Sequence, residues 1–460
     1  MRLTRRQWIL ATTGWASVLR SQAQWLGERP WQAPQITVVN PRLRVPVSFI
    51  IDDSTCLVNL NRFAIPQFAE AWGYQRYHQD WRSMPVEIPD SFVRKFGEWC
   101  AEQGVKGKYS VVPYPACVGR LDRLLPGWTS KELEASIELV RKLMVPNWDI
   151  HPEMVTHTRV IDLKTGHPYP EVNPRYMENW RWTEGKSVDE IAAYIAYALR
   201  ILRNIGLPCE GITTPGGFGY GALAQLAQAT FQACRDVYGT EIPHYFRNVI
   251  SEGEASVAPR VEYARNITGT DPECVVSIIG CTGDWTGNWD ATQKPEPDRY
   301  ITPDLQRGRL VEVIERGEPA VLVSHWTGIY YNGQELGFQA FQEVVRRLRE
   351  RYGWRIQWMK LSEIARYWAA KELTTIEVDG VRVRFHAPYA CPQFTFRVDG
   401  PAPSAQPVFY ANGRPRPLSR VEREEALGSW NYLVQRDHWV VCVDLPKGPS
   451  AMSLPGPAKA

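Results

Sequence analysis

Short apolar runs alternate along the chain with longer segments in which apolar residues recur every three or four positions. The short runs predict buried strands and the longer segments predict amphipathic helices. The predicted strands are 45–51, 108–114, 147–151, 209–214, 274–280, 320–326 and 356–359. The predicted helices are 89–104, 129–144, 187–206, 220–239, 302–317, 337–353 and 361–372. Strands that alternate with helices indicate a parallel sheet, so we expect an α/β fold.

The number of these strand–helix units favours closure of the sheet. About seven units within roughly 330 residues are typical of a closed or nearly closed (β/α) barrel, which we assign to residues 45–371. In such barrels the chemistry lies at the carboxyl ends of the strands. Polar residues that follow the predicted strands are therefore the first candidates for a functional site.

The pattern changes at about residue 372, where apolar and polar residues begin to alternate strictly. Asp-Gly and Asn-Gly pairs separate these segments and are typical of hairpin turns. We therefore expect a small β-sandwich-like module at 372–448. Residues 449–460 have the composition of a disordered tail, and residues 24–44 that of an irregular lead-in.

The N-terminus has the layout of an export signal. Arg5 and Arg6 precede an apolar stretch at 8–19, and small residues follow up to Ala23. The segment "TRRQWIL" resembles a twin-arginine motif, so residues 1–23 predict a periplasmic or extracellular protein. An amphipathic N-terminal helix is the alternative. No later stretch reaches membrane length, so we expect no stable membrane span after signal removal.

The composition narrows the classes of partner. The net charge is +3, from 53 basic and 50 acidic residues, and this balance argues against a nucleic-acid partner. Nineteen tryptophans are compatible with stacking on sugar rings and also with ordinary core packing. The nine cysteines contain no CxxC pair, which argues against a cysteine zinc site.

Two strand ends carry groups that bind metals in other proteins. Asp52 and Asp53 follow the first strand, and both can reach one site only if the chain turns there. His151 and His157 are six residues apart, a spacing that allows them to meet only on a bent loop. Pro152 favours such a bend. The alternatives are an ordinary turn and two unrelated loop histidines.

Two further strand ends and one loop add candidates. Pro215 begins a Pro-Gly-Gly turn after one strand, and His325 lies at the end of another. Residues 283–290 place Asp284 beside Trp285, as in the lining of many polar pockets. A plain βα turn, a structural histidine and an exposed loop are the respective alternatives.

Taken together, these groups match one design. Two histidines and one aspartate with an open fourth position are typical of a catalytic divalent-metal site, often zinc. The second aspartate can deprotonate a metal-activated water, and His325 can protonate a leaving group.

The order of these motifs along 45–365 resembles the polysaccharide deacetylase superfamily of metal-dependent carbohydrate esterases. The resemblance rests on "FIIDD" at 49–53, the histidine pair, the Pro215 turn, Asp284-Trp285 and "LVSH" at 322–325. It implies a deformed (β/α) barrel that binds a divalent metal, with zinc expected.

The resemblance also implies roles for individual residues. Asp52 would be the catalytic base, and the metal ligands would be Asp53, His151 and His157. His325 would be the acid and Asp284 would orient it. Trp285, Pro215 and Tyr330 would line the substrate site.

Three features depart from the family pattern. The family's histidine pair is usually four residues apart, and an arginine usually lies near the proline turn to hold the base. Here the histidines are six apart and the turn at 211–219 contains no arginine. The long segment between Asp53 and His151 also contains an aromatic stretch, "EAWGYQRYHQDW", at 70–81.

The sequence therefore predicts an exported metal-dependent hydrolase that removes acyl groups from a polysaccharide or related glycan. In this prediction, activated water attacks an amide or ester carbonyl. One alternative is a glycoside hydrolase that uses two carboxylates such as Asp52 and Asp284. The other is a non-catalytic protein whose β module and tryptophans bind a glycan.

Overall fold

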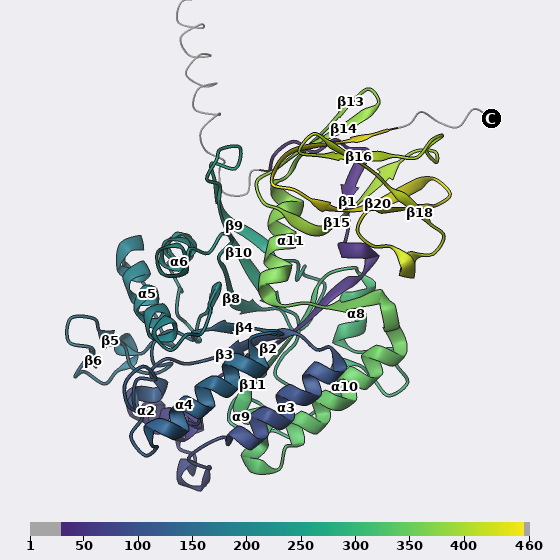
Figure 1. Ribbon diagram of the computed structural model, residues 1–460. Helices are drawn as coiled ribbons and strands as arrows, with labels where there is room; N and C mark the ends of the chain where they lie inside the picture. The colour runs from purple at the N-terminus through teal and green to yellow at the C-terminus, as the bar shows by residue number, and fades with distance from the viewer. Residues whose placement is uncertain (1–28, 455–460) are drawn as a thin grey trace, which may run out of the picture. The chain divides into compact units, whose positions relative to one another are not determined.

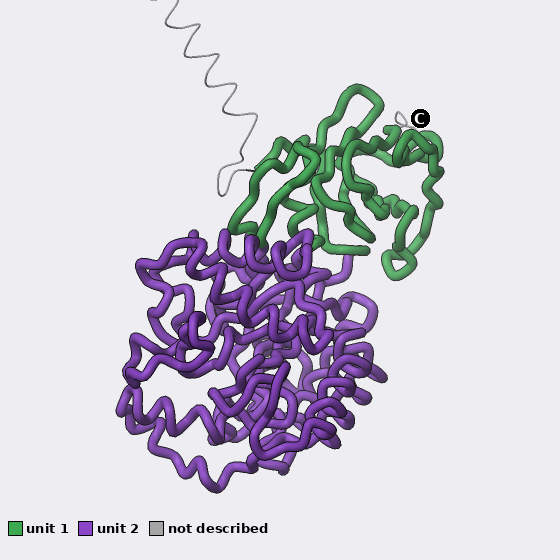
Figure 2. The backbone as a smooth tube through the Cα atoms, turned by 60° about the vertical axis from the view of Figure 1, so that its left-hand side comes forward, with its two compact units in different colours: residues 1–42, 261–275, 366–460 green, residues 43–260, 276–365 purple. Residues whose placement is uncertain are grey.

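A computed structural model describes residues 29–454, which form two compact units (Figure 2). The larger unit comprises 43–260 and 276–365 and mixes strands with helices. The smaller unit comprises the described residues of 1–42 and 366–460 together with 261–275. The predicted export signal at 1–23 lies outside the described residues. No helix of the described chain combines the length and apolarity needed to cross a membrane.

The first sheet of the larger unit contains the strand that ends in the paired aspartates. Its order is β11-β2-β3-β4, and each neighbouring pair is parallel. The strand β12 also pairs with the start of β2. The bounds are β2 (Val45–Asp52), β3 (Gly107–Ser110), β4 (Trp148–His151), β11 (Ala320–His325) and β12 (Ile356–Trp358).

The second sheet has the order β7-β8-β10-β9. Its strands are β7 (Gly211–Thr213), β8 (His244–Val249), β9 (Arg260–Arg265) and β10 (Glu273–Gly280). The sequence pattern did not predict β8, because only its first three residues are buried and the run is too short and polar to stand out.

Isolated contacts connect these two sheets at two places, between β4 and β7 and between β10 and β11. Glu153, two residues after β4, and Thr213, the last residue of β7, form a single parallel bridge. Beyond β10, the Cys281 amide donates to the Val321 carbonyl at 2.8 Å. The ladder is not continuous across either junction, so the architecture described by the strand pairing is a mixed α/β fold with separate sheets.

The long helices lie where the periodic segments predicted them. They are α3 (Asp90–Gln103), α4 (Ser130–Leu139), α5 (Val188–Asn204), α6 (Leu223–Tyr238), α10 (Leu336–Tyr352) and α11 (Leu361–Leu373). Thr129 and Ser187 cap α4 and α5 in capping boxes, each with a glutamate three residues on.

Other helices differ from the prediction. The helix predicted at 302–317 is restricted to α8 (Arg309–Glu315), because Gly308 has a φ of 114° and interrupts the segment. The helix α2 (Leu60–Trp72) was not predicted, and it contains Pro66. Two short helices complete the set, α7 (Pro297–Tyr300) and α9 (Trp326–Tyr330).

The helices α3 and α10 lie beside the first sheet (Figure 1), and aromatic packing attaches them to it. The ring of Phe49 in β2 stacks on Phe341 of α10 with centroids 3.9 Å apart. Phe96 of α3 packs against Trp148 of β4 at 5.7 Å. These contacts anchor the strands at whose ends the candidate site lies.

The smaller unit contains two five-stranded sheets, β1-β15-β20-β19-β18 and β13-β14-β21-β16-β17. Phe385 of β14 lies 5.2 Å from Phe396 of β15, so the two sheets pack face to face. The strands are β1 (Ile36–Val38), β13 (Thr375–Asp379), β14 (Arg382–Ala387), β15 (Cys391–Asp399), β16 (Val408–Ala411), β17 (Arg414–Pro417), β18 (Ser419–Val421), β19 (Asn431–Val434), β20 (His438–Leu445) and β21 (Gly448–Ser453).

Two boundaries of this module differ from the sequence prediction. The segment 24–44, expected to be irregular, includes β1, which pairs with β15. The expected tail at 449–460 begins inside β21, which pairs with β14 and β16. Both strands are short and lack an extended apolar pattern, so tertiary pairing and not local sequence defines them.

Candidate functional site

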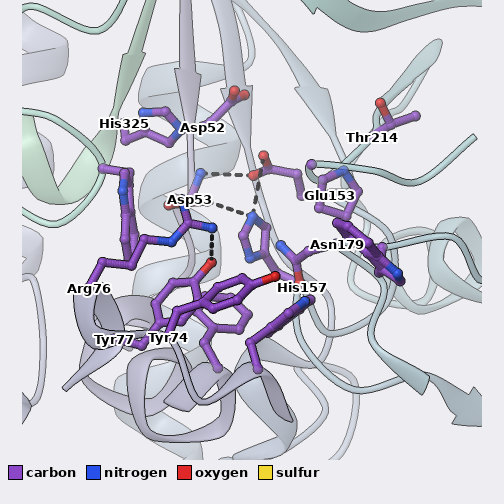
Figure 3. A pocket seen from close by; sticks show the side chains of 16 residues that line it. Asp52, Asp53, Tyr74, Arg76, Tyr77, Glu153, His157, Asn179, Thr214 and His325 are labelled. Carbon is purple, nitrogen blue, oxygen red and sulfur yellow. Dashed lines mark hydrogen bonds and ion pairs between the residues drawn. The ribbon is translucent and has the colours of Figure 1, made fainter. Parts of the chain in front are cut away.

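A cavity of 280 Å³ lies at the carboxyl ends of β2 and β11 (Figure 3). Carboxylates and histidines form one part of its lining, and aromatic side chains form another. The lining residues are Asp52, Asp53, Phe68, Trp72, Tyr74, Arg76, Tyr77, Glu153, His157, Asn179, Trp180, Thr214, Pro215, Gly216, Trp289 and His325.

A sharp turn brings both aspartates into this cavity. Asp52 is the last residue of β2, and Asp53 has a φ of 61°, in the left-handed region that non-glycine residues rarely adopt. Without the turn, the two side chains would point to opposite faces of the strand. The backbone here carries strain that the surrounding structure holds in place, as is frequent at functional sites.

Asp53, Glu153 and His157 form a buried cluster at the cavity. The Nε2 atom of His157 lies 2.8 Å from Oδ1 of Asp53 and 3.8 Å from Oε1 of Glu153. The backbone amide of Asp53 donates to Oε2 of Glu153 at 2.8 Å. One ligand atom from each of the three side chains lies within 4.8 Å of the others. His157 also has a positive φ, 64°, so both histidine and aspartate are presented from tight turns.

The three groups hold one another in unequal protonation states. Burial alone would raise the pKa of Asp53, but the charge and hydrogen bond of His157 lower it below the ordinary value. Burial and the charges of Asp52 and Asp53 raise the pKa of Glu153 to about 7. Burial would lower the pKa of His157, but the charge and hydrogen bond of Asp53 raise it to about 9.

This donor set fits a divalent cation. Two carboxylate oxygens and one imidazole nitrogen converge on one point, and all three side chains are buried. Oxygen and imidazole ligands suit zinc and other first-row divalent ions. A cation between them would also neutralise the two buried carboxylates, for which His157 is the cation in direct contact.

A buried lysine holds the other aspartate. Lys108 of β3 has no exposed surface, and its ammonium forms an ion pair with Asp52. The same group donates to the Ser110 hydroxyl at 2.7 Å and to the Ile51 carbonyl at 3.2 Å. All three ammonium protons therefore have acceptors, and Asp52 has a cation in direct contact that fixes its position.

His325 and Asp284 form a second charged pair. Nδ1 of His325 lies 2.8 Å from Oδ2 of Asp284, and Thr286 donates to the other oxygen from its hydroxyl at 2.7 Å and its amide at 3.1 Å. Burial would lower the pKa of His325, but the hydrogen bond to Asp284 and the nearby charge of Asp53 raise it to about 10. His325 is therefore protonated at neutral pH.

Glu178, which is fully buried, holds the loop that carries His157. Its carboxylate accepts the amide of His157 at 2.6 Å, the amide of Thr156 at 3.0 Å, and the hydroxyl of Tyr194. Burial raises the pKa of Glu178 to about 7 despite these donors. The loop adopts its unusual backbone because this one side chain satisfies its amides.

Comparison with known proteins gives no family. No protein-family model and no curated protein sequence matches the chain. Among solved structures, it is similar to a glycoside hydrolase with a TM-score of 0.32 at 10% identity, over 79% of this chain and 88% of that one. A glycoside hydrolase 29 family member from an unknown rumen bacterium has a TM-score of 0.33 at 10% identity, over 93% of this chain and 75% of that one.

A glycoside hydrolase family 30 subfamily 8 xylanase from Clostridium acetobutylicum has a TM-score of 0.23 at 10% identity, over 79% of this chain and 92% of that one. TM-scores this low do not identify a shared fold.

Five of the residues predicted from the sequence line the cavity together: Asp52, Asp53, His157, Pro215 and His325. Asp284 lies behind His325, in contact with its ring, which agrees with an orienting position. The Pro-Gly-Gly turn approaches protein backbone closely, since the Gly217 amide donates to the Asn179 carbonyl at 2.7 Å. A Cβ on Gly217 would lie 2.9 Å from that oxygen.

His151 does not join the cluster, contrary to the prediction. Its Nε2 lies 2.9 Å from Nε2 of His244 in β8, and its Nδ1 lies 3.3 Å from the Thr213 hydroxyl. It is the last residue of β4 and is fully buried, away from the cavity lining. Glu153, two residues further on, belongs to the cluster instead.

Two predicted substrate-binding residues also lie elsewhere. Trp285 packs on Tyr300 at 4.9 Å and beneath the guanidinium of Arg299, outside the cavity lining. Tyr330, at the end of α9, packs against Phe92 at 4.9 Å. Trp289, from the same loop as Trp285, lines the cavity instead.

Three residues of the site were not predicted, and only one of them could have been recognised from the local sequence. Glu153 lies four residues before His157, the spacing that the resembled family uses for its metal-ligand pair. That spacing could have identified it. Lys108 and Glu178 gave no local signal, because their partners are distant in sequence.

Proposed function

We propose that this protein is a metal-dependent hydrolase that removes acyl groups from a glycan. The observation that carries the proposal is the buried cluster of Asp53, Glu153 and His157, which opens into a cavity with Asp52 and His325 in the same lining. Zinc is the first candidate for the cation, since the donor set is two carboxylates and one imidazole.

Each group of the chain has a definable role in this reaction. Asp53, Glu153 and His157 would hold the cation, which would supply Lewis-acid polarisation of a carbonyl and lower the pKa of water. Asp52 accepts a proton from the attacking water, and Lys108 fixes the orientation of its carboxylate. His325, kept protonated by Asp284, donates a proton to the leaving nitrogen or oxygen.

The proposal includes a deformed (β/α) barrel of about seven strands. Its support is that isolated contacts join the two sheets at both junctions, Glu153 to Thr213 and Cys281 to Val321. The carboxyl ends of the strands would then surround the cavity, as in other barrels of parallel strands.

Metal analysis and an acyl-release assay test the function. The purified protein is expected to contain about one equivalent of divalent metal, and to release acetate from an acetylated oligosaccharide. Chelation should abolish release, and added zinc should restore it. Glu153→Ala should lose both metal and activity, whereas Glu171→Ala, a change at an exposed position, should retain both. Full metal content in Glu153→Ala would contradict the assigned ligand set.

A glycoside hydrolase is the second candidate. Glu153 has its pKa raised to about 7 while that of Asp53 is lowered, and such divergence is typical of a carboxyl acid paired with an ionised carboxylate. Under this alternative, release of reducing sugar ends would persist in excess chelator. Acetate release without reducing ends, and only with metal, would exclude it.

The export signal at residues 1–23 belongs to the proposal as well. Its support is the Arg5-Arg6 pair followed by an apolar stretch. Fractionation of cells that produce the full chain should find it outside the cytoplasm, whereas the double variant Arg5→Lys/Arg6→Lys should accumulate inside. Equal export of both would contradict a twin-arginine route.

A further inference from the structure

The aromatic stretch at 70–81 forms a wall of the cavity that contains Asp53, Glu153 and His157, called here the metal-centre cavity. Trp72, at the end of α2, and Tyr74 and Tyr77 just beyond it line the cavity. The rings of Tyr74 and Tyr77 are nearly parallel, with centroids 6.2 Å apart and an interplanar angle of 25°. Tyr74 is about half exposed at 49%. Flat, accessible rings of this kind suit the apolar faces of sugars.

A cation accompanies these rings. The guanidinium of Arg76 lies 4.7 Å from the centre of the Tyr77 ring and donates to the Tyr77 hydroxyl at 2.7 Å (Figure 3). Arg76 is exposed, and no carboxylate of the described residues forms an ion pair with it. The metal-centre cavity thus has carboxylates at one side and an arginine with spare donors at the aromatic side.

A second cavity of 460 Å³ shares one residue with the first, Trp180. Its indole is 40% exposed and packs edge-on against Trp72 at 6.3 Å. The second cavity also has Tyr169 and Tyr176 in its lining, with ring centroids 5.0 Å apart. The two cavities therefore adjoin at Trp180, and an elongated ligand that spans this indole would occupy both.

Cations predominate in the second cavity. Arg175, Arg181 and Lys186 line it together with a single carboxylate, Glu184. Glu184 lies 4.0 Å from Arg181, at the limit of an ion pair, and Lys186 contacts Glu190 at 3.5 Å. The charge balance of the lining is therefore positive.

The cations are interleaved with rings. Lys186 lies 4.6 Å above the ring of Trp182, and Arg181 lies 5.8 Å from the ring of Trp180 and 4.2 Å from that of Tyr220. Rings that stack on sugars and guanidinium groups that pair with carboxylate or sulfate are therefore side by side in one lining.

We propose that the second cavity, called here the cationic subsite and defined by Arg175, Arg181, Lys186 and Trp180, binds an anionic segment of the glycan whose acyl group reaches the metal centre. The inference rests on the proposed function for the identity of the ligand as a glycan. Carboxylated and sulfated sugars share the required chemistry. A nucleic acid fits less well, because the chain has a nearly balanced charge, with 53 basic and 50 acidic residues and a net charge of +3.

Binding to the full-length chain tests the proposal separately from catalysis. Titration calorimetry in excess chelator would compare an oligouronate, a sulfated oligosaccharide and a neutral oligosaccharide of equal length. We expect the oligouronate or the sulfated sugar to bind at least about tenfold more tightly than the neutral one, with an affinity that falls as salt rises.

Charge-matched variants identify the location. Arg175→Ala/Arg181→Ala/Lys186→Ala should weaken binding of the anionic oligosaccharide about tenfold, since each exposed contact contributes a few tenths to about 1 kcal/mol. The control Arg94→Ala/Lys131→Ala/Arg200→Ala removes the same charge from exposed helical positions outside both cavities and should leave binding unchanged. The single variant Arg175→Ala should show a smaller loss in the same direction, and provides the test if the triple variant does not fold.

Several results would overturn the proposal. They are equal binding of neutral and anionic sugars, equal loss in the control triple variant, and tight binding of single-stranded DNA without binding of either anionic sugar. Anionic binding that depends on the cationic subsite, in a protein without metal or acyl release, would support the subsite and refute the proposed catalysis. Metal-dependent acyl release with no preference for anionic sugars would do the reverse.

Discussion

His151 and His157 lie six residues apart on the same segment, yet they occupy opposite electrostatic environments. His157 faces Asp53 and Glu153 at the cavity, and these carboxylates raise its pKa to about 9. His151 faces His244 in the interior, where burial and the charge of the second ring lower its pKa far below the ordinary value. Two Nε2 atoms 2.9 Å apart can share a single proton.

The difference shows that a histidine near a strand end is not a ligand by its position alone. What separates the two is the partner that the fold supplies: carboxylates from β2 and the loop for His157, and a second imidazole from β8 for His151. The first environment can hold a cation, whereas the second favours neutral rings and contributes to the interior packing.

The strongest test of this comparison is a pair of alanine variants. His157→Ala should lower the affinity for the divalent metal by a factor on the order of 10³, because one of three protein ligands is lost. Acyl release should fall with it. His151→Ala should keep its metal affinity within about threefold, since its ring faces away from the cluster. Calorimetric titration of both apo proteins with zinc measures the contrast, and equal losses would contradict the assignment.

The free energy of unfolding should rank the two alanine variants in the opposite order. His151→Ala is expected to lower the free energy of unfolding by about 3 kcal/mol, because it opens a buried void and leaves His244 without its partner. His157→Ala should cost less in the metal-free protein above pH 9, where the ion pair of His157 with Asp53 is lost and the variant removes only a side chain that borders the cavity. Urea unfolding of the two apo variants above pH 9 gives the comparison, and a larger loss for His157→Ala would refute it.

The sequence made part of this comparison predictable. The apolar run 45–51 placed Asp52 and Asp53 at the end of a strand, and the turn needed to bring them together appears as the positive φ of Asp53. His157 and His325 were also found, because each follows a predicted strand or bend. These signals are local, and local patterns specify strands and turns well.

The missed residues depend on contacts between distant segments. Lys108 begins a strand like any other polar residue, and its ion pair with Asp52 spans 56 positions of sequence. His244 lies in β8, whose short half-buried pattern did not predict a strand, so nothing indicated a partner for His151. Only Glu153 had a usable local signal, the four-residue spacing to His157.

The pH dependence of stability should distinguish the His151–His244 pair from His157, because the pKa of His244 is lowered and that of His157 is raised. The pKa of His244 is lowered to about 4 from the usual 6.5, chiefly by burial. A folded-state pKa below the unfolded value gives stability that is present above pH 6.5 and is lost as pH falls toward 4, here by up to about 3 kcal/mol. For His157 the folded-state pKa is raised, so its contribution is present below pH 6.5 and is lost as pH rises through about 9.

Urea unfolding of the metal-free protein between pH 4 and 10 measures the loss of stability at acid pH and the loss at alkaline pH. His244→Gln should reduce the loss of stability at acid pH, which His151 shares, and leave the loss at alkaline pH unchanged. His157→Gln should reduce the loss at alkaline pH, which His325 shares, and His78→Gln, at an exposed position, should change neither. A loss at acid pH that persists unchanged in His244→Gln would show that another group causes it.

The smallest expected effect concerns Glu178, which keeps the His157 side of the comparison in place. Glu178→Gln retains the shape of the side chain but turns an acceptor of several donors into a group with donors of its own, which then face the amides of Thr156 and His157. The metal affinity should fall about tenfold, as for other groups that orient a metal ligand without binding the metal. Tyr194→Phe removes one donor and leaves the carboxylate, so its effect should be smaller. If Glu178→Gln binds zinc like the parent protein, the loop does not need this carboxylate, and the turn at His157 must be held by the packing around it.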